Sequence, residues 1–178
     1  MKELPKRKKI RLNGYDYSRT GYYFITICVK DKHEILGEIV GDDAHIVPST
    51  DIPTITLSKF GIISDKFIKN IDNTYPDVTV DKYVIMPNHI HLILVIHRKP
   101  GHGPMRASVP TAVISNIVRS LKILVTKECG FSFWQRSYHD HIIRDEDEYR
   151  RIWQYIDENP AKWHEDCYNC DSNRFSDS

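Results

Sequence analysis

The spacing of apolar residues along the chain alternates between a period of two and a period of three to four, which predicts strands and helices in succession. One strand, at 89–96, is apolar at nearly every position, so we expect it in the centre of its sheet. Stretches rich in aromatic and β-branched residues predict the other extended segments: strands at 22–29 and 78–86, a short hairpin at 34–47 that returns at 45–47, and an extended stretch at 131–144.

Three helices are predicted by apolar residues three and four positions apart. They run from 59 to about 73, from 111 to about 129 and from 146 to 158. Ser58, Thr111 and Asp145 are the expected N-caps, and Gly130 is expected to end the second helix. The expected inner faces carry Val113, Ile117, Leu121 and Leu124 in the second helix, and Tyr149, Ile152, Trp153 and Ile156 in the third.

The order strand, helix, strand, strand, helix, strand, helix is typical of the ferredoxin-like (split βαβ) fold. We therefore expect an α+β protein with an antiparallel sheet, helices on one face and one appended C-terminal helix. A single domain is expected over 1–178, with a basic arm at 1–14, a flexible loop at 98–110 and an acidic tail at 164–178. Because this fold serves many functions, the function has to be argued from the site.

Composition narrows the class of protein. The chain has 178 residues, 40% of them hydrophobic, which is enough for one buried core and excludes wholesale disorder. Lys+Arg 25 and Asp+Glu 24 leave a net charge of +1, so the chain as a whole is not a strongly basic nucleic-acid binder. Residues 2–11 nevertheless hold six basic side chains and one acidic one, which indicates a polyanionic partner for this end.

Neither export nor membrane insertion is indicated by the sequence. The longest apolar run, 92–96, is far shorter than the roughly 20 residues that span a bilayer, and no apolar stretch follows the basic N-terminus. The 4 cysteines are too few for a disulfide framework in a chain of this length. We expect a reduced, cytoplasmic protein.

Two histidines on one strand are the sharpest chemical feature. His89 and His91 stand at positions i and i+2 of the strand at 89–96, so their imidazoles point to one face, within reach of one ion. The alternative is a half-buried, hydrogen-bonded histidine pair without a metal, because a divalent ion needs further ligands. The pair by itself leaves both interpretations open.

A second polar pair is predicted on the third helix. Tyr155 lies off the apolar stripe, and Asn159 follows one turn later on the same side, so a phenol and an amide would be presented together. The alternative is that Tyr155 is a boundary aromatic residue and Asn159 a helix C-cap beside Pro160.

Both pairs lie within longer motifs that carry a family resemblance. Nearly the whole chain, from Ile10 to Trp163, resembles the single-tyrosine HUH transposases, in particular the REP-associated tyrosine transposases and their insertion-sequence relatives. The resemblance rests on MPNHIHL (86–92), YHDHIIRDEDEY (138–149), RRIWQYIDENPAKW (150–163) and the opening IRLNGYDYSRTGYYFITICV (10–29).

The resemblance implies a metal-dependent transposase, encoded by a mobile element or its domesticated descendant, that cleaves and rejoins single-stranded or hairpin DNA through a 5′-phosphotyrosine link. It implies that His89, His91 and Asn159 are metal ligands and that Tyr155 is the nucleophile. The implied cofactor is a divalent ion, Mg²⁺ or Mn²⁺, and the implied partner is DNA. A monomer and a homodimer both remain compatible with it.

Further residues are candidate contacts around such a site. His139 and His141 form a second His-x-His and are interpreted as an outer cluster beside the ligands or as DNA contacts. His164, Cys167 and Cys170 form half of a zinc pattern, without a second cysteine pair to complete it. The candidate contacts to the DNA backbone are Lys6, Arg7, Lys8, Lys9 and Arg11 in the arm, and Arg119, Lys122 and Arg136 farther along the chain.

Two rival functions remain at this stage. One is a DNA-binding protein of the same fold that has lost cleavage; covalent capture of labelled DNA separates the two. The other is a histidine-based nucleotide hydrolase. That chemistry requires a third alternating histidine, but Ile93 stands at the position where it would be.

Overall fold

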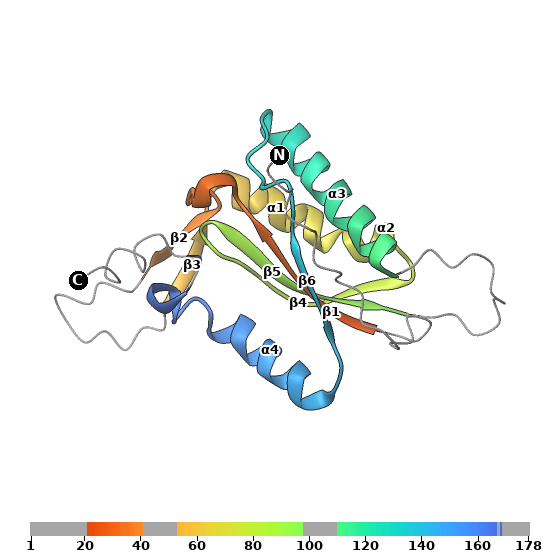
Figure 1. Cartoon of the computed structure of the whole chain (residues 1–178). Coiled ribbons are helices and arrows are strands. Elements are labelled where there is room, and N and C mark those ends of the chain that lie inside the picture. Colours follow the sequence, from red (N-terminus) through yellow and green to blue (C-terminus); the bar gives the residue numbers. More distant parts are fainter. Residues whose placement is uncertain (1–20, 41–52, 98–109, 167, 169–178) are drawn as a thin grey trace, which may run out of the picture.

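Four strands form one antiparallel sheet in the order β4-β5-β1-β6 (Figure 1). The computed structural model describes residues 21–40, 53–97, 110–166 and 168. The predicted arm lies outside these residues, as do nearly all of the predicted loop and most of the predicted acidic tail. The strands are β1 (Gly21–Cys28), β4 (Val78–Ile85), β5 (His89–Ile96) and β6 (His139–Ile143).

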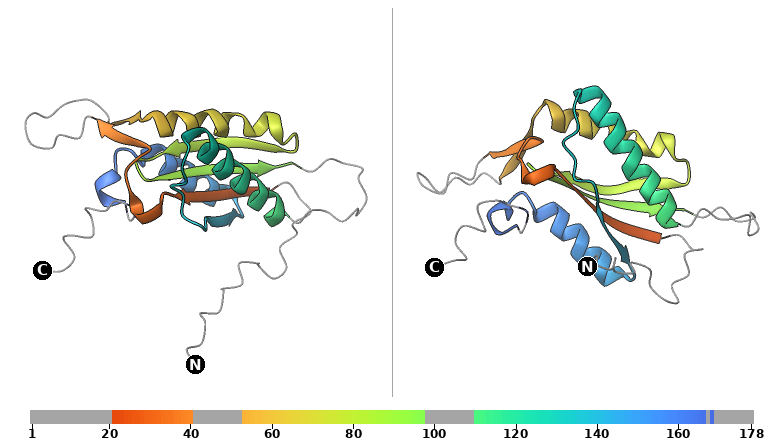
Figure 2. Two further views of the ribbon diagram at one scale, coloured as in Figure 1. Left: turned by 90° about the horizontal axis from the view of Figure 1, so that it is seen from above. Right: turned by 45° about the horizontal axis from the view of Figure 1, so that its top comes forward.

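The helices cover the two faces of the sheet unequally. Three lie on one face: α1 (Lys59–Lys69), α2 (Ile71–Thr74) and α3 (Pro110–Cys129). The fourth, α4 (Glu146–Glu158), lies alone on the other face (Figure 2). Element order and strand order together are those of a ferredoxin-like sheet with one appended helix, so the predicted α+β fold class is confirmed.

A separate two-stranded sheet precedes α1. It pairs β2 (Gly37–Val40) with β3 (Thr54–Leu57). The partner strand of β2 was predicted at 45–47, and in the structure it is β3 instead. Residues 45–47 lie outside the described residues. Two short 3₁₀ helices complete the elements: η1 (Lys30–Lys32) and η2 (Trp163–Glu165).

The alternation along β5 divides the interior into two layers. Ile90, Leu92 and Leu94 face α1 and α3 and belong to the main core. Ile93 faces α4 and forms a smaller core with Ile143 and Ile156. Apolar residues on both faces explain why β5 is central. The site described below occupies the α4 side.

Two predicted helix boundaries differ from the structure. Helix α3 begins at Pro110, so Thr111 lies inside the helix and is not its N-cap. The helix predicted from 59 to about 73 ends at Lys69, and α2 follows it after Asn70.

The other predicted helix ends, two N-caps and one glycine stop, are confirmed. The Ser58 hydroxyl accepts hydrogen bonds from the backbone N–H groups of Phe60 and Gly61, and the Asp145 carboxylate accepts one from Glu148 N–H. Gly130 ends α3 with a φ of 83°, a left-handed conformation that glycine adopts at little cost.

The predicted inner faces contain two errors. Leu124 is 42% exposed, whereas its neighbour Val125 is buried. Trp153 is 39% exposed and lies outside the stripe that Ile156 anchors. The buried face of α3 is thus rotated relative to the predicted one, whereas that of α4 is narrower than the apolar spacing suggested. No helix in the described part of the chain is long and apolar enough to cross a membrane.

Candidate metal and tyrosine site

His89 and His91 converge on one point on the α4 side of the sheet. Both side chains are buried, and their Nε2 atoms lie 2.9 Å apart. Ligand atoms about 2.1 Å from a common ion lie about 3 Å from one another in octahedral geometry. The pair is therefore arranged as two ligands of one divalent ion would be.

Each imidazole is oriented through its Nδ1 atom. Nδ1 of His89 lies 2.9 Å from the Asn88 side-chain oxygen, and Nδ1 of His91 lies 2.9 Å from the Thr26 hydroxyl. The Asn88 amide group donates to the backbone oxygens of Lys32 and Tyr168, which leaves its oxygen facing His89. His89 therefore carries its proton on Nδ1, and its Nε2 lone pair points at the shared position. Such outer hydrogen bonds are what orient histidine ligands in metal sites.

The Thr26 hydroxyl allows His91 to adopt either tautomer. Because a hydroxyl both donates and accepts, Nδ1 of His91 is satisfied with or without its proton. Nε2 of His91 can then donate to Nε2 of His89, or instead offer a lone pair to an ion. The ring nitrogens of the pair thus have partners both with and without an ion, which offsets the free-energy cost of burying two polar rings.

Aromatic rings enclose the pair and keep it neutral. Phe24 stacks on His91 with ring centroids 5.1 Å apart, and the rings of Trp163 and Tyr168 lie 6.0 and 4.6 Å from that of His89. Burial lowers the pKa of His91 to about 3. Burial, and then the charges of His91 and Lys32, lower the pKa of His89 well below its ordinary value. Neutral imidazole is the form that binds metals.

Helix α4 brings Tyr155 to the histidines. The Tyr155 hydroxyl oxygen lies 3.1 Å from Nε2 of His91, and its ring lies edge-on to Phe24. Ile156 is buried against the sheet, which turns the neighbouring Tyr155 toward the site while leaving its side chain 40% exposed. The phenol is therefore both next to the candidate ligands and open to a substrate.

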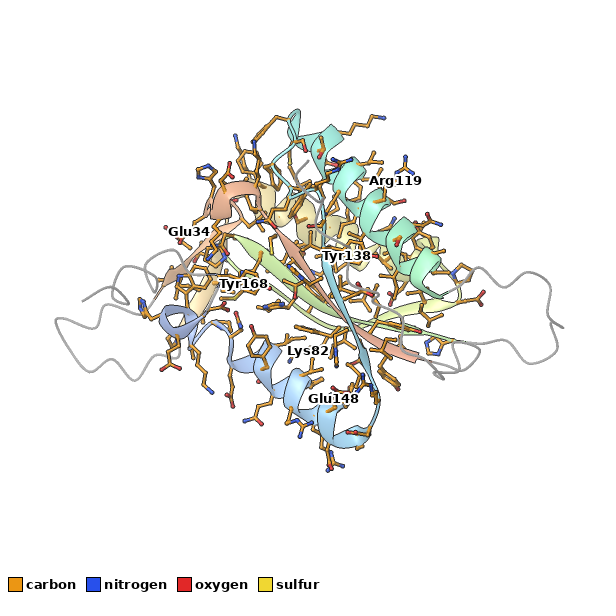
Figure 3. The ribbon with its side chains drawn as sticks, in the orientation of Figure 1. Glu34, Lys82, Arg119, Tyr138, Glu148 and Tyr168 are labelled. Carbon is orange, nitrogen blue, oxygen red and sulfur yellow. The ribbon has the colours of Figure 1, made fainter. Side chains whose placement is uncertain are left out.

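A β-bulge fastens α4 to the sheet. The register of β4 against β5 shifts between Val80 and Lys82, so Asp81 and Lys82 both contact α4. Asp81 accepts a hydrogen bond of 2.8 Å from the Tyr149 hydroxyl. The Lys82 ammonium group lies 2.5 Å from the Asp157 carboxylate and 3.6 Å from the centre of the Trp153 ring (Figure 3). These contacts fix the position of α4 along β4, and with it the place where Tyr155 meets the sheet.

Two oxygen-bearing side chains complete the surroundings. Asn159, the predicted third ligand, is buried at the end of α4, and its side-chain oxygen has no hydrogen-bond partner among the described residues. Asp166 is also buried, and its carboxylate lies 3.8 Å from Nε2 of His89. His89, His91 and Asp166 form a group that could hold a metal ion.

Asp166 was not among the ligands predicted from the sequence. It falls within the predicted acidic tail, and no spacing rule connects it to the histidine strand. Helix η2 buries Trp163 and turns the chain back toward His89, which carries Asp166 into the site. The signal available in the sequence was a tryptophan, a large apolar side chain, shortly after the predicted end of the third helix.

A cavity of about 370 Å³ opens beside Tyr155. It lies along one side of α4 and the turn after it, and Asp166 and Glu165 line its far end. Tyr155 and Asn159 both border it. The cavity therefore reaches Tyr155 and Asp166, the two side chains that lie next to the histidine pair.

The other predicted residues lie apart from this centre. His139 and His141 are exposed on β6, where Nε2 of His141 lies 2.7 Å from the Glu148 carboxylate. On the opposite face of the sheet, Arg119 is exposed on α3 (Figure 3), and the Lys122 ammonium group donates to the backbone oxygens of Gln135 and Ser137. Arg136 and Lys122 border a second cavity there. The arm residues Lys6, Arg7, Lys8, Lys9 and Arg11, and the cysteines Cys167 and Cys170, lie outside the described residues.

Comparison with solved structures defines the class of fold. The chain is similar to a structure described as a REP-associated tyrosine transposase bound to a REP hairpin, with a TM-score of 0.57 and 20% sequence identity over 86% of this chain and 74% of that one. The resemblance inferred from the motifs is thus confirmed at the level of the fold. No family profile matches the sequence.

Comparison of sequences places the chain in a particular family. A protein of Haemophilus influenzae (strain ATCC 51907 / DSM 11121 / KW20 / Rd), described as an uncharacterized protein, is 35% identical over 177 residues, which cover 90% of this chain and 91% of the relative. The chain belongs to the same family as that protein.

Proposed function

We propose that this chain is a metal-dependent transposase-type enzyme that cleaves and rejoins single-stranded or hairpin DNA with Tyr155 as its nucleophile. One observation carries the proposal: the Tyr155 hydroxyl oxygen lies 3.1 Å from Nε2 of His91, which itself lies 2.9 Å from Nε2 of His89. A nucleophile beside two convergent neutral imidazoles is what phosphodiester cleavage at a metal requires. The fold shared with a REP-associated tyrosine transposase agrees with this reaction.

The residues present fit a divalent ion, either Mg²⁺ or Mn²⁺. His89, His91 and Asp166 would hold it, and the buried oxygen of Asn159 is a further candidate ligand. Carboxylate and amide oxygens suit these hard ions, and imidazole nitrogens extend the set. When bound, the ion supplies positive charge that stabilises the phosphoryl oxygens and the phenolate form of tyrosine.

Tyr155 carries the covalent step. A phenol is almost fully protonated at neutral pH because its reference pKa is about 10, so it must lose its proton as it attacks. The tyrosine oxygen forms a bond to phosphorus while the bond from phosphorus to the 3′ oxygen breaks. The phenol proton passes to water, the 3′ oxygen takes a proton, and the 5′ phosphate remains on Tyr155.

The link to tyrosine supports rejoining without an external energy source. A phosphotyrosine diester retains the energy of the bond that was broken, so the 3′-hydroxyl of a second strand can displace Tyr155. The rings of Phe24, Trp163 and Tyr168 shield the histidine side of the site from water, which favours transfer over hydrolysis.

Covalent capture tests the proposal. The purified chain is incubated with Mn²⁺ and a pool of end-labelled hairpin oligonucleotides with single-stranded flanks, and the products are separated on a denaturing gel. We expect a labelled protein band whose DNA maps to the peptide containing Tyr155.

Two tyrosine variants control the assignment. Tyr155→Phe keeps the ring and should lose the adduct while still binding the hairpins. Tyr149→Phe removes a hydroxyl group from the same helix. That hydroxyl donates its hydrogen bond to Asp81 and not to the site, so this variant should keep the adduct. Hairpin binding without any adduct in the natural chain would support a DNA-binding protein that does not cleave.

A further inference from the structure

The cavity beside Tyr155 has a positive pole at one end. Arg151 and Tyr155 stand one helical turn apart on α4 and both line the cavity. Asp166 lines the opposite end, next to His89. A substrate bound to Tyr155 and the histidine pair therefore extends along α4 toward Arg151.

The other cation of the cavity is already neutralised. The Lys162 ammonium group lies 2.6 Å from the Glu158 carboxylate, which also accepts a hydrogen bond from the Gln154 side chain. Arg151 makes no ion pair with any residue in the described parts of the chain, 21–40, 53–97, 110–166 and 168. Its guanidinium group is thus the charge on this wall that an anionic ligand can use.

The spacing of Arg151 and Tyr155 along α4 matches that of neighbouring phosphates in a nucleotide strand. Four residues of α-helix advance about 6 Å along the axis, which is comparable to the separation of adjacent phosphates in an extended nucleotide strand. A guanidinium group binds two oxygens of one phosphate at once, which a lone ammonium group cannot do with the same geometry.

We propose that Arg151 binds the DNA phosphate adjacent to the one that Tyr155 attacks, so that the cavity positions a single strand by gripping two consecutive phosphates. The proposal rests on the proposed function for the identity of the first phosphate. The new element is a substrate-binding role for Arg151, with the strand lying along α4.

Arg150 supplies a matched control. It is the preceding residue on the same helix and carries the same charge, but its Nε lies 3.2 Å from the Glu146 carboxylate, both side chains are largely exposed, and it does not line the cavity. Arg150→Ala and Arg151→Ala therefore remove the same charge from the same helix, but only Arg151→Ala removes it from the cavity wall.

The first experiment measures binding alone. Fluorescence anisotropy of labelled dT12 with Mn²⁺ is recorded over a range of salt concentrations for the natural chain and both variants. Arg151→Ala should weaken binding about tenfold and reduce the slope of log affinity against log salt by about 0.7, the value of one contact to a single strand. Arg150→Ala should leave the slope unchanged. Equal slopes for the two variants would overturn the proposal.

The second experiment locates the phosphate. In an oligonucleotide that the chain captures covalently, single phosphates near the cleaved one are replaced by uncharged methylphosphonates. The penalty of Arg151→Ala should vanish when the phosphate next to the cleaved one is neutral and persist at other positions, as in a double-mutant cycle. If Arg151→Ala weakens binding equally whichever phosphate is neutral, Arg151 binds no particular phosphate and the proposal is overturned. Failure of the proposed function is visible separately, as the absence of an adduct with the natural chain.

Discussion

Thr26 of β1 and His91 of β5 face one another across the sheet, and the Thr26 hydroxyl oxygen lies 2.9 Å from Nδ1 of His91. Replacing Thr26 by Val keeps the shape of the side chain and removes this bond. We expect the Kd for Mn²⁺ to rise about tenfold, the usual effect of losing an outer hydrogen bond to a histidine ligand. Isothermal titration calorimetry measures it. Thr26→Ser retains the hydroxyl and should retain the affinity; an equal loss in both variants would refute the role given to this bond.

The histidine pair itself should be required for metal binding. His91→Ala removes one of two convergent nitrogens and should abolish measurable binding of Mn²⁺, whereas His139→Ala on the exposed edge strand should leave it largely unchanged. Circular dichroism checks that both variants fold. Loss of binding in the His139 variant alone would mean that the other His-x-His holds the ion.

Asp166 should contribute to ion affinity through its carboxylate. Asp166→Asn keeps the size of the side chain and removes its charge, so we expect the Kd for Mn²⁺ to rise by about tenfold or more. Glu165→Gln removes the same charge from the adjacent, exposed residue and should change the Kd far less. Similar effects in the two variants would indicate a general electrostatic contribution and not a ligand.

Lys82 should stabilise the attachment of α4. Lys82→Met preserves the apolar stem but removes the contacts of the ammonium group with Asp157 and the Trp153 ring. The free energy of unfolding should fall by about 1 kcal/mol, measured by urea denaturation. Lys69→Met breaks a pair between an exposed ammonium group and Asp65 within α1, without an aromatic ring beside it, and should cost less. A larger cost for the Lys69 variant would contradict this role of Lys82.

Glu148 should give a pH-dependent contribution to stability. Burial tends to raise the pKa of its carboxyl, but hydrogen bonds from Arg144 N–H and His141 outweigh burial and hold the pKa below its ordinary value. The contribution is therefore present above the ordinary pKa of about 4.5 and is lost as the pH falls through the lower pKa of the folded state.

Comparison of the natural chain with Glu148→Gln tests this sign. The variant should be less stable by about 1 kcal/mol at pH 7. The difference should shrink as the pH is lowered below about 4, measured by denaturation at each pH. A difference that grows on acidification would contradict the lowered pKa.

Local patterns in the sequence were sufficient to predict the central strand of the sheet and the two histidines of the site. The alternation along 89–96 predicts a central strand and places His89 and His91 on one face, because successive side chains of a strand point to opposite sides. The capping residues Ser58 and Asp145 likewise predict where α1 and α4 begin, because an N-cap acts on the first turn of its own helix. These features depend on neighbours in the chain, and the sequence alone determined them.

Tertiary structure alone decided which distant groups meet the histidines. Tyr155 reaches His91, 64 residues away in the sequence, because α4 packs against this face of the sheet. Asp81 and Lys82, at the bulge in β4, both contact α4. Asp166 enters the site because η2 turns the chain back over His89. No periodicity records such contacts, since each depends on how a helix or turn packs against a sheet made by other parts of the chain.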